Sequence, residues 1–171
     1  MAHDGVEMPK TALFPDLLDL TAATLPEIEA LMERARAAVR ARTSRDGKPS
    51  AALLEEHQFA AHGLSWLATY VEALRQLRAW AGRVSETGAF GEMEALILQL
   101  GFGEYLAQIA GGIPMSQVET IRLSALGVSK AEARRFEDAA EAVIIAGSSD
   151  AAKARLAALI AANPDVVTFG D

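Results

Sequence analysis

The sequence predicts an all-α protein, arranged as one orthogonal or bundle-like helical domain. Hydrophobic residues make up 51% of the 171 residues and aromatic residues only 6%. This composition, rich in alanine and leucine, favours helix over sheet. Apolar residues also recur at three- and four-residue steps over long stretches, whereas no alternating apolar pattern continues beyond a few residues. A chain of this length can bury a substantial core.

Two helices are predicted in the first part of the chain. A short apolar helix is expected over residues 16–23. Thr24 and Glu27 then have the spacing of a capping box, and Pro26 suits the first turn of a helix. A second helix is therefore predicted to begin at Thr24 and to reach about Arg42, before a polar turn.

The longest predicted element is a helix from Ser50 to Val84, which no proline interrupts. At 1.5 Å per residue it would measure on the order of 50 Å. Because that is long for a small domain, more than one partner helix must cover it. A second long helix is predicted over residues 90–110, and Gly111-Gly112 should end it.

Three further helices are expected. Ser116 and Glu119 form a capping box that predicts a short helix ending near residues 126–127. Ser129 and Glu132 repeat the pattern and predict a helix to about residue 146. A last helix should begin at residue 149 or 150 and end near residue 162.

The domain organisation follows from these elements. Residues 1–15 are predicted to be a flexible arm and residues 16–164 a single all-α domain. Residues 165–171 are predicted to be a tail or a linker towards a catalytic domain that lies outside this chain.

Charge and residue types exclude several classes of function. The net charge of −7 argues against a nucleic-acid partner, since phosphate binding needs surplus Lys and Arg. The chain has no cysteine, which excludes disulfides and thiolate chemistry. We find neither a signal peptide nor an apolar run long enough to span a membrane, so a cytoplasmic protein is expected. No Glu precedes His57 or His62 by three residues, so a di-iron bundle site is not predicted.

His62, Trp66 and Tyr70 are spaced four apart and should share one helix face. One interpretation is a polar pocket between helices. The simpler one is an aromatic seam whose N–H and O–H groups find partners on the next helix. Nothing in the sequence supplies an activated serine, so the seam is the preferred interpretation and no catalytic residue is predicted.

Three other features have a structural and a functional interpretation. Gly101 and Gly103 lie inside a predicted helix and so indicate close helix packing rather than a dinucleotide loop, and Gly63 has the same expected role. The basic run between Arg34 and Lys48 is either a solvated helix face or a docking patch for an acidic partner or a phosphate. The corner over residues 111–117 is either a tight connection or a helix N-terminus open to an anion.

Three strings carry a resemblance to a known family: HGLSWLATYVEALR over residues 62–75, FGEME over 90–94 and FGEYLAQIAGGIPMSQ over 102–117. They resemble the N-terminal extension of the (2S)-methylsuccinyl-CoA dehydrogenases, within the acyl-CoA dehydrogenase family. The resemblance is close over about residues 51–126 and looser towards the tail, where residues 168–171 look like the junction with the catalytic body.

The resemblance implies a parent flavoprotein of the ethylmalonyl-CoA pathway. Such an oxidoreductase uses FAD and a glutamate base to convert methylsuccinyl-CoA to mesaconyl-CoA. The family's flavin domain, catalytic glutamate and CoA groove lie beyond residue 171, so no FAD is expected to bind this chain and no metal site is implied. The implied partner is the flavin-binding catalytic domain, in a parent enzyme expected to be a homo-oligomer.

The sequence therefore leaves three functions open: an accessory domain of a flavoenzyme, a free-standing helical protein-interaction module, and a self-sufficient enzyme. The candidate interface or polar seam comprises His62, Trp66, Tyr70, Glu104, Gln108, Gly111, Gly112, Pro114 and Ser116.

Overall fold

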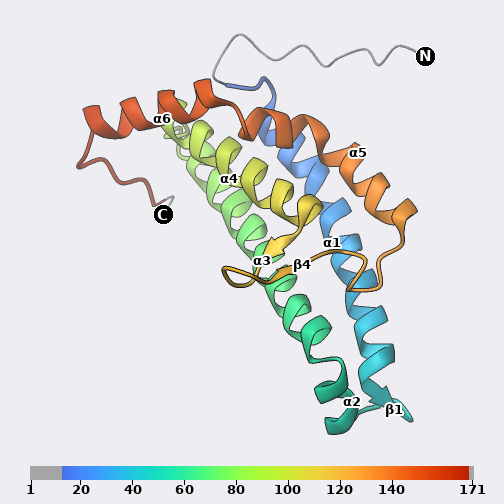
Figure 1. Ribbon diagram of the computed structural model, residues 1–171. Helices are drawn as coiled ribbons and strands as arrows, with labels where there is room; N and C mark the ends of the chain where they lie inside the picture. The colour runs from blue at the N-terminus through green and yellow to red at the C-terminus, as the bar shows by residue number, and fades with distance from the viewer. Residues whose placement is uncertain (1–12, 170–171) are drawn as a thin grey trace.

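The computed structural model describes residues 13–169, and this range is mostly helical (Figure 1). The helices are α1 (Leu17–Thr43), α2 (Ala51–Glu56), α3 (Gln58–Glu86), α4 (Glu92–Gly111), α5 (Lys130–Gly147) and α6 (Asp150–Ala162). Two antiparallel pairs of two-residue strands connect them, β1 (Ser44–Arg45) with β2 (Lys48–Pro49) and β3 (Ile113–Pro114) with β4 (Thr120–Ile121). The predicted all-α class is confirmed. The predicted division into arm, domain and tail stays a prediction, and most of the arm lies outside the described residues.

Four helices form the core. α1 packs against α3 and α5, and α4 packs against the same two helices, so the four surround one common interior. α5 contributes the buried Phe136, Ala140 and Val143 to this interior. The largest fully buried side chains are apolar and come from α1, α3, α4, the β3–β4 hairpin and the turn that follows it. They include Ile28, Leu31, Leu67, Leu74, Leu98, Phe102, Leu106, Ile109, Ile113, Ile121 and Leu126. α6 lies across α4 and buries only Ala152.

α4 and α5 do not extend along the full length of the two long helices. α1 and α3 have 27 and 29 residues, whereas α4 and α5 have 20 and 18. A difference of about nine residues corresponds to about 13 Å of helix. The C-terminal end of α1 and the N-terminal end of α3 therefore project beyond α4 and α5, together with the β1–β2 hairpin and α2 (Figure 1). We call this part the distal arm.

The predicted start of a helix at Thr24 is wrong. α1 is continuous from Leu17 to Thr43 and contains Pro26 within it. Thr24 is buried, and its hydroxyl donates to the carbonyl of Leu20 at 2.8 Å. Mid-helix threonines are commonly satisfied in this way. The core packing of α1 on both sides of Pro26 outweighs the missing backbone N–H.

The long helix predicted over residues 50–84 is interrupted at His57. That residue has φ −109° and ψ 24° and separates α2 from α3. Helical hydrogen bonds continue across it, from His57 N to Leu53 O and from Ala61 N to His57 O, both at 3.0 Å. α2 contributes no buried residue, so tertiary packing does not hold it in line with α3.

The short helix predicted from Ser116 does not form. β3 and β4 pair instead, with Ile113 opposite Ile121, and both of these side chains are buried. Val118, between them, is 93% exposed. A helix over this stretch would have had little apolar surface to bury, whereas the hairpin places two isoleucines in the core. Turns follow up to Gly127.

The later caps and the glycine contacts are confirmed. Ser129 Oγ accepts the N–H of Glu132 at 3.3 Å, and Glu132 Oε2 accepts the N–H of Ser129 at 2.9 Å. Ser149 is the N-cap of α6. At the α4–α5 crossing, a Cβ on Gly103 would lie 2.3 Å from the Cα of Gly147, so only glycine permits these backbones to approach so closely.

Candidate functional site

The aromatic residues of α3 form a seam against α4. The Tyr70 hydroxyl donates to Gln108 Oε1 at 2.7 Å, and the ring of Tyr70 meets that of Tyr105 edge-on, with centroids 4.6 Å apart. Burial, with a smaller contribution from Tyr105, raises the pKa of Tyr70 above its usual value. Tyr70 therefore stays neutral and serves as a hydrogen-bond donor between the two helices.

His62 and Trp66 lie at the exposed end of the seam. Trp66 Nε1 donates to His62 Nε2 at 3.0 Å, so this histidine nitrogen acts as an acceptor. A hollow of about 310 Å³ is lined by His62, Ser65, Trp66 and Thr69. Both hydroxyls in it donate to carbonyls of their own helix, Ser65 to Ala61 at 3.2 Å and Thr69 to Ser65 at 2.9 Å. Neither hydroxyl is paired with a base, so the arrangement is suited to packing and contact rather than to nucleophilic catalysis.

Glu104 does not join the seam. Its Oε1 lies 2.9 Å from Lys153 Nζ, so it connects α4 to α6. Of the predicted site residues on α3 and α4, the structure brings together His62, Trp66, Tyr70 and Gln108.

The remaining predicted residues form a corner after α4. Gly111 ends the helix, and Gly112 has φ 125° and donates its N–H to Gln108 O at 2.8 Å. Pro114 pairs with Thr120 in the β3–β4 hairpin. Ser116 Oγ accepts the N–H of Glu119 at 3.2 Å, but no helix begins there. Of the two interpretations of residues 111–117, the one that needs a new helix N-terminus for an anion is therefore wrong, and the stretch is a tight connection.

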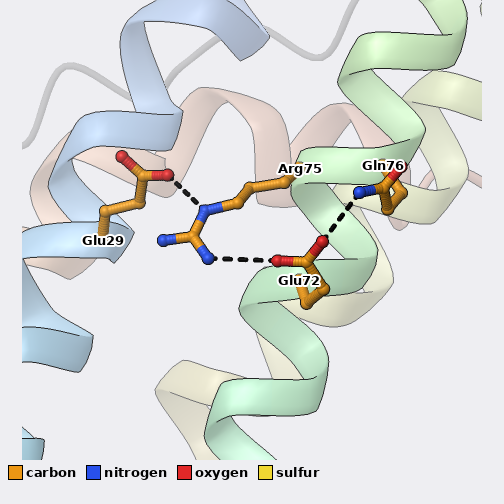
Figure 2. Close-up of polar contacts among 4 residues, drawn as sticks. All are labelled: Glu29, Glu72, Arg75 and Gln76. Atoms are coloured by element: carbon orange, nitrogen blue, oxygen red, sulfur yellow. Dashed lines mark hydrogen bonds and ion pairs between the residues drawn. The ribbon is translucent and has the colours of Figure 1, made fainter.

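A charged network on the outer face of α1 and α3 was not predicted. Arg75 Nε donates to Glu29 Oε1 at 2.5 Å, and Arg75 Nη1 donates to Glu72 Oε2 at 3.1 Å (Figure 2). Gln76 Nε2 donates to Glu72 Oε1 at 2.7 Å. The hydrogen bonds from Gln76 and then from Arg75 lower the pKa of Glu72. This network links two helices across 46 positions of sequence, a separation that helical spacing cannot reveal.

The segment after α6 is anchored through Thr168. Trp80 Nε1 donates to Thr168 O at 2.9 Å, and Thr168 Oγ1 donates to Glu94 Oε1 at 2.7 Å. Glu94 Oε2 also accepts the N–H of Gly91, at 3.1 Å, at the start of α4. These bonds hold the segment against α3 and α4.

The last turn of α6 and the segment after it expose apolar side chains. Ile160, Val166, Val167 and Phe169 are 50%, 53%, 67% and 70% exposed. They are four of the seven large hydrophobic side chains exposed among the described residues. We call residues 160–169 the anchored tail. The run Val166-Val167 and Phe169 was visible in the sequence as apolar residues outside any helix, which could have identified this surface.

Within residues 13–169, no group of three or more His, Cys, Asp or Glu side chains is placed to hold a metal ion. No described helix has the length and apolar character needed to cross a membrane.

A comparison with known proteins finds a similar enzyme. The chain is 58% identical over 158 residues to the (2S)-methylsuccinyl-CoA dehydrogenase of Cereibacter sphaeroides. The match covers 92% of this chain but only 28% of the length of that enzyme. No protein-family model matches the chain. The resemblance noted in the sequence is confirmed: the chain is similar to part of an acyl-CoA dehydrogenase-related enzyme.

Proposed function

We propose that this chain is an accessory N-terminal helical domain of an FAD-dependent acyl-CoA dehydrogenase similar to methylsuccinyl-CoA dehydrogenase. In this proposal it has a structural and interface role and is not catalytic alone. Its support is the similarity of this chain to a stretch that makes up 28% of the length of the Cereibacter sphaeroides enzyme. The seam supports it too, because the hydroxyls of Ser65 and Thr69 are bonded to their own helix rather than to a base.

The single observation that carries the interface role is the anchored tail. Exposed apolar side chains on a freely moving segment would favour aggregation. Here Thr168 holds the segment by hydrogen bonds to Trp80 and Glu94. Contiguous exposed apolar surface commonly marks a contact with another protein surface. The proposed partner is the flavin-binding catalytic domain of the same enzyme, which would cover Val167 and Phe169.

The activity proposed for the whole enzyme is the oxidation of methylsuccinyl-CoA to mesaconyl-CoA in the ethylmalonyl-CoA pathway, in the cytoplasm. FAD and the catalytic base belong, in this proposal, to the catalytic domain and not to this chain. The whole enzyme is proposed to be a homo-oligomer.

The closed core favours a second candidate, a free-standing helical interaction module. Phe102 and Leu106 are fully buried within the chain itself, so the helices do not need a catalytic body to form an interior. This candidate and the first differ in whether the anchored tail becomes covered in a larger protein.

The proposal can be tested by replacement in the Cereibacter sphaeroides enzyme. The stretch that matches this chain is exchanged for residues 1–171, and methylsuccinyl-CoA oxidation and FAD content are measured. We expect an active, FAD-loaded enzyme, and a colourless, inactive protein when the 171-residue chain is purified alone. Turnover and bound FAD in the isolated chain would instead identify a self-sufficient enzyme.

A matched pair of variants tests the interface role in the same protein. Val167→Ser should lower the thermal stability of the replaced enzyme, because it removes a covered apolar side chain. Val118→Ser, at a position 93% exposed on the β3–β4 hairpin, should change it little. Equal effects of the two substitutions would favour the independent module.

A further inference from the structure

Helix α6 lies on the outside of the four-helix core and buries little of its own surface (Figure 1). Of its 13 residues only Ala152, near its start, is buried, whereas Leu156 and Leu159 are partly buried. Its contacts are mainly with α4. A helix of this length is marginal in water without tertiary support. The position of α6 therefore depends on the contacts that hold it and the segment after it against the core.

Two ion pairs connect α6 to α4. Lys153 Nζ lies 2.9 Å from Glu104 Oε1. Arg155 donates from Nε and Nη2 to the two carboxylate oxygens of Glu92, at 2.8 and 2.5 Å. Because the two acids stand about 18 Å apart along α4, α6 crosses α4 between them. All four side chains are between 40% and 49% exposed, and exposed pairs add little stability and weaken as salt is raised.

The anchored tail is fastened to the core through Thr168. Its carbonyl oxygen accepts the Trp80 indole N–H at 2.9 Å, and its hydroxyl donates to Glu94 Oε1 at 2.7 Å. Glu94 is only 6% exposed, so water cannot easily replace that hydroxyl, and the hydrogen bond is worth more than one at the surface. Thr168 follows Ala162, the last residue of α6, by only six positions. A bound Thr168 therefore keeps the end of α6 close to α4.

We propose that α6 and the anchored tail, residues 150–169, form a strap that opens and closes as one unit on the four-helix core, with Thr168 as its clasp. Release of Thr168 leaves α6 with two exposed ion pairs and little buried surface, too little to keep a short helix docked. The core stays closed, because the contact between Gly103 and Gly147 and the burial of Phe102 do not involve the strap. A partner bound to the closed tail would also hold α6 closed. The strap is a property of this chain alone and stands apart from the accessory-domain function.

Hydrogen exchange followed by NMR in the ¹⁵N-labelled 171-residue chain tests the strap. The chain forms its own interior, so no other domain is needed. We expect the amides of residues 154–162 to share one opening equilibrium and to exchange at least about a hundredfold faster than the amides of α4. The indole N–H of Trp80, which is bonded to Thr168, should report the same opening. Protection of α6 equal to that of α4 would overturn the proposal.

A matched pair of threonine substitutions tests the clasp. Thr168→Val removes the hydroxyl bonded to Glu94 and keeps the shape of the side chain, so exchange across residues 154–162 should become about tenfold faster. Thr69→Val removes a hydroxyl bonded to its own helix and should leave that exchange within about twofold. Amides at the α4–α5 crossing should not change in either variant. Faster exchange confined to residues 166–169 in Thr168→Val would show that the tail moves without α6 and would contradict a single unit.

A substitution in α6 tests the same coupling in the other direction. Arg155→Gln removes an ion pair with α4 and should speed exchange of the Trp80 indole N–H about threefold, although that N–H is bonded to Thr168 and not to Arg155. The indole N–H of Trp66, bonded within α3, is the internal control and should not change. Arg36→Gln, which removes an ion pair within α1, should leave both indoles unchanged. Constant exchange at Trp80 in Arg155→Gln would mean that helix and tail open separately, against the proposal.

Discussion

The α4–α5 crossing and the distal arm present helix surfaces of opposite kinds, one closely packed and one exposed. At the crossing, Gly103 and Gly147 bring two backbones into direct contact, and Phe102 beside them is fully buried. In the distal arm, α2 contributes no buried residue, and Leu54 on this helix is 39% exposed. The two glycines at the crossing allow one partner helix to pack closely, and the same chain supplies that helix. The residues of α2 leave its surface exposed.

The two regions should respond differently to substitution. Close packing makes the crossing sensitive to the addition or removal of a single carbon atom. Because α2 contributes no buried residue, substitutions in it should leave the fold intact. The following predictions measure that contrast.

The largest contrast is expected for matched phenylalanine substitutions. Phe102→Ala should lower the free energy of unfolding by about 4 kcal/mol, because it removes a fully buried ring and leaves a cavity. Phe59→Ala, at a position 45% exposed near the start of α3, should cost less than about 1 kcal/mol. Urea denaturation followed by circular dichroism measures both. Similar losses would mean that the distal arm is covered in solution.

A glycine pair on α4 tests the crossing itself. Gly103→Ala should cost about 3 kcal/mol, because the added Cβ meets the backbone of Gly147, which cannot rotate away. Gly111→Ala has open space around its Cβ and should be neutral or stabilise by about 0.5 kcal/mol through higher helix propensity. The same denaturation experiment applies. A neutral Gly103→Ala would show that α4 and α5 lie further apart.

A serine pair compares a capping box that starts a helix with one that does not. Ser129→Ala removes the N-cap of α5 and should cost about 1 kcal/mol. Ser116→Ala removes an exposed turn contact and should change stability by less than about 0.5 kcal/mol. Thermal unfolding reports the difference. A larger loss of stability for Ser116→Ala would show that the β3–β4 hairpin stabilises the protein more than its exposure suggests.

The smallest effect concerns pH. The pKa of Glu72 is lowered from its ordinary 4.5 by Gln76 and Arg75. Its contribution to stability is therefore fully present above pH 4.5 and is lost as pH falls through the lowered value. In an NMR pH titration of the Glu72 carboxyl, Gln76→Ala and Arg75→Gln should each move the midpoint upward. An unchanged midpoint in both variants would show that the network of Figure 2 does not persist in solution.

Helical periodicity predicted most of the fold, and its failures have specific causes. Helix α3 is visible in the sequence because its apolar residues form one stripe. Helix α4 is visible as a long apolar run, because it packs against α3, α5 and α6 and buries consecutive residues such as Glu94, Ala95 and Leu96. The start at Thr24 failed because a buried threonine can bond back to its own helix as readily as it can cap a new one. The helix at Ser116 failed because pairing between residues 113–114 and 120–121 is a tertiary outcome that no local pattern records.

The candidate site was predictable only where its residues share one helix. The spacing of His62, Trp66 and Tyr70 indicated a seam, and the sequence strings indicated the family. The anchoring of Thr168 by Trp80 and Glu94 joins positions 88 and 74 residues apart, which sequence spacing cannot show. The basic run on α1 was recognised, but the hollow beside it also depends on where α2 and α3 lie.

Hydrogen exchange of the anchored tail tests the central claim most directly. Exchange at Val166, Val167 and Phe169 is measured by mass spectrometry in the isolated chain and in the Cereibacter sphaeroides enzyme that carries this chain in place of its matching stretch. An accessory domain packed on a catalytic body predicts strong protection of these amides in the enzyme and rapid exchange in the isolated chain. Equally rapid exchange in an active replaced enzyme would contradict the claim.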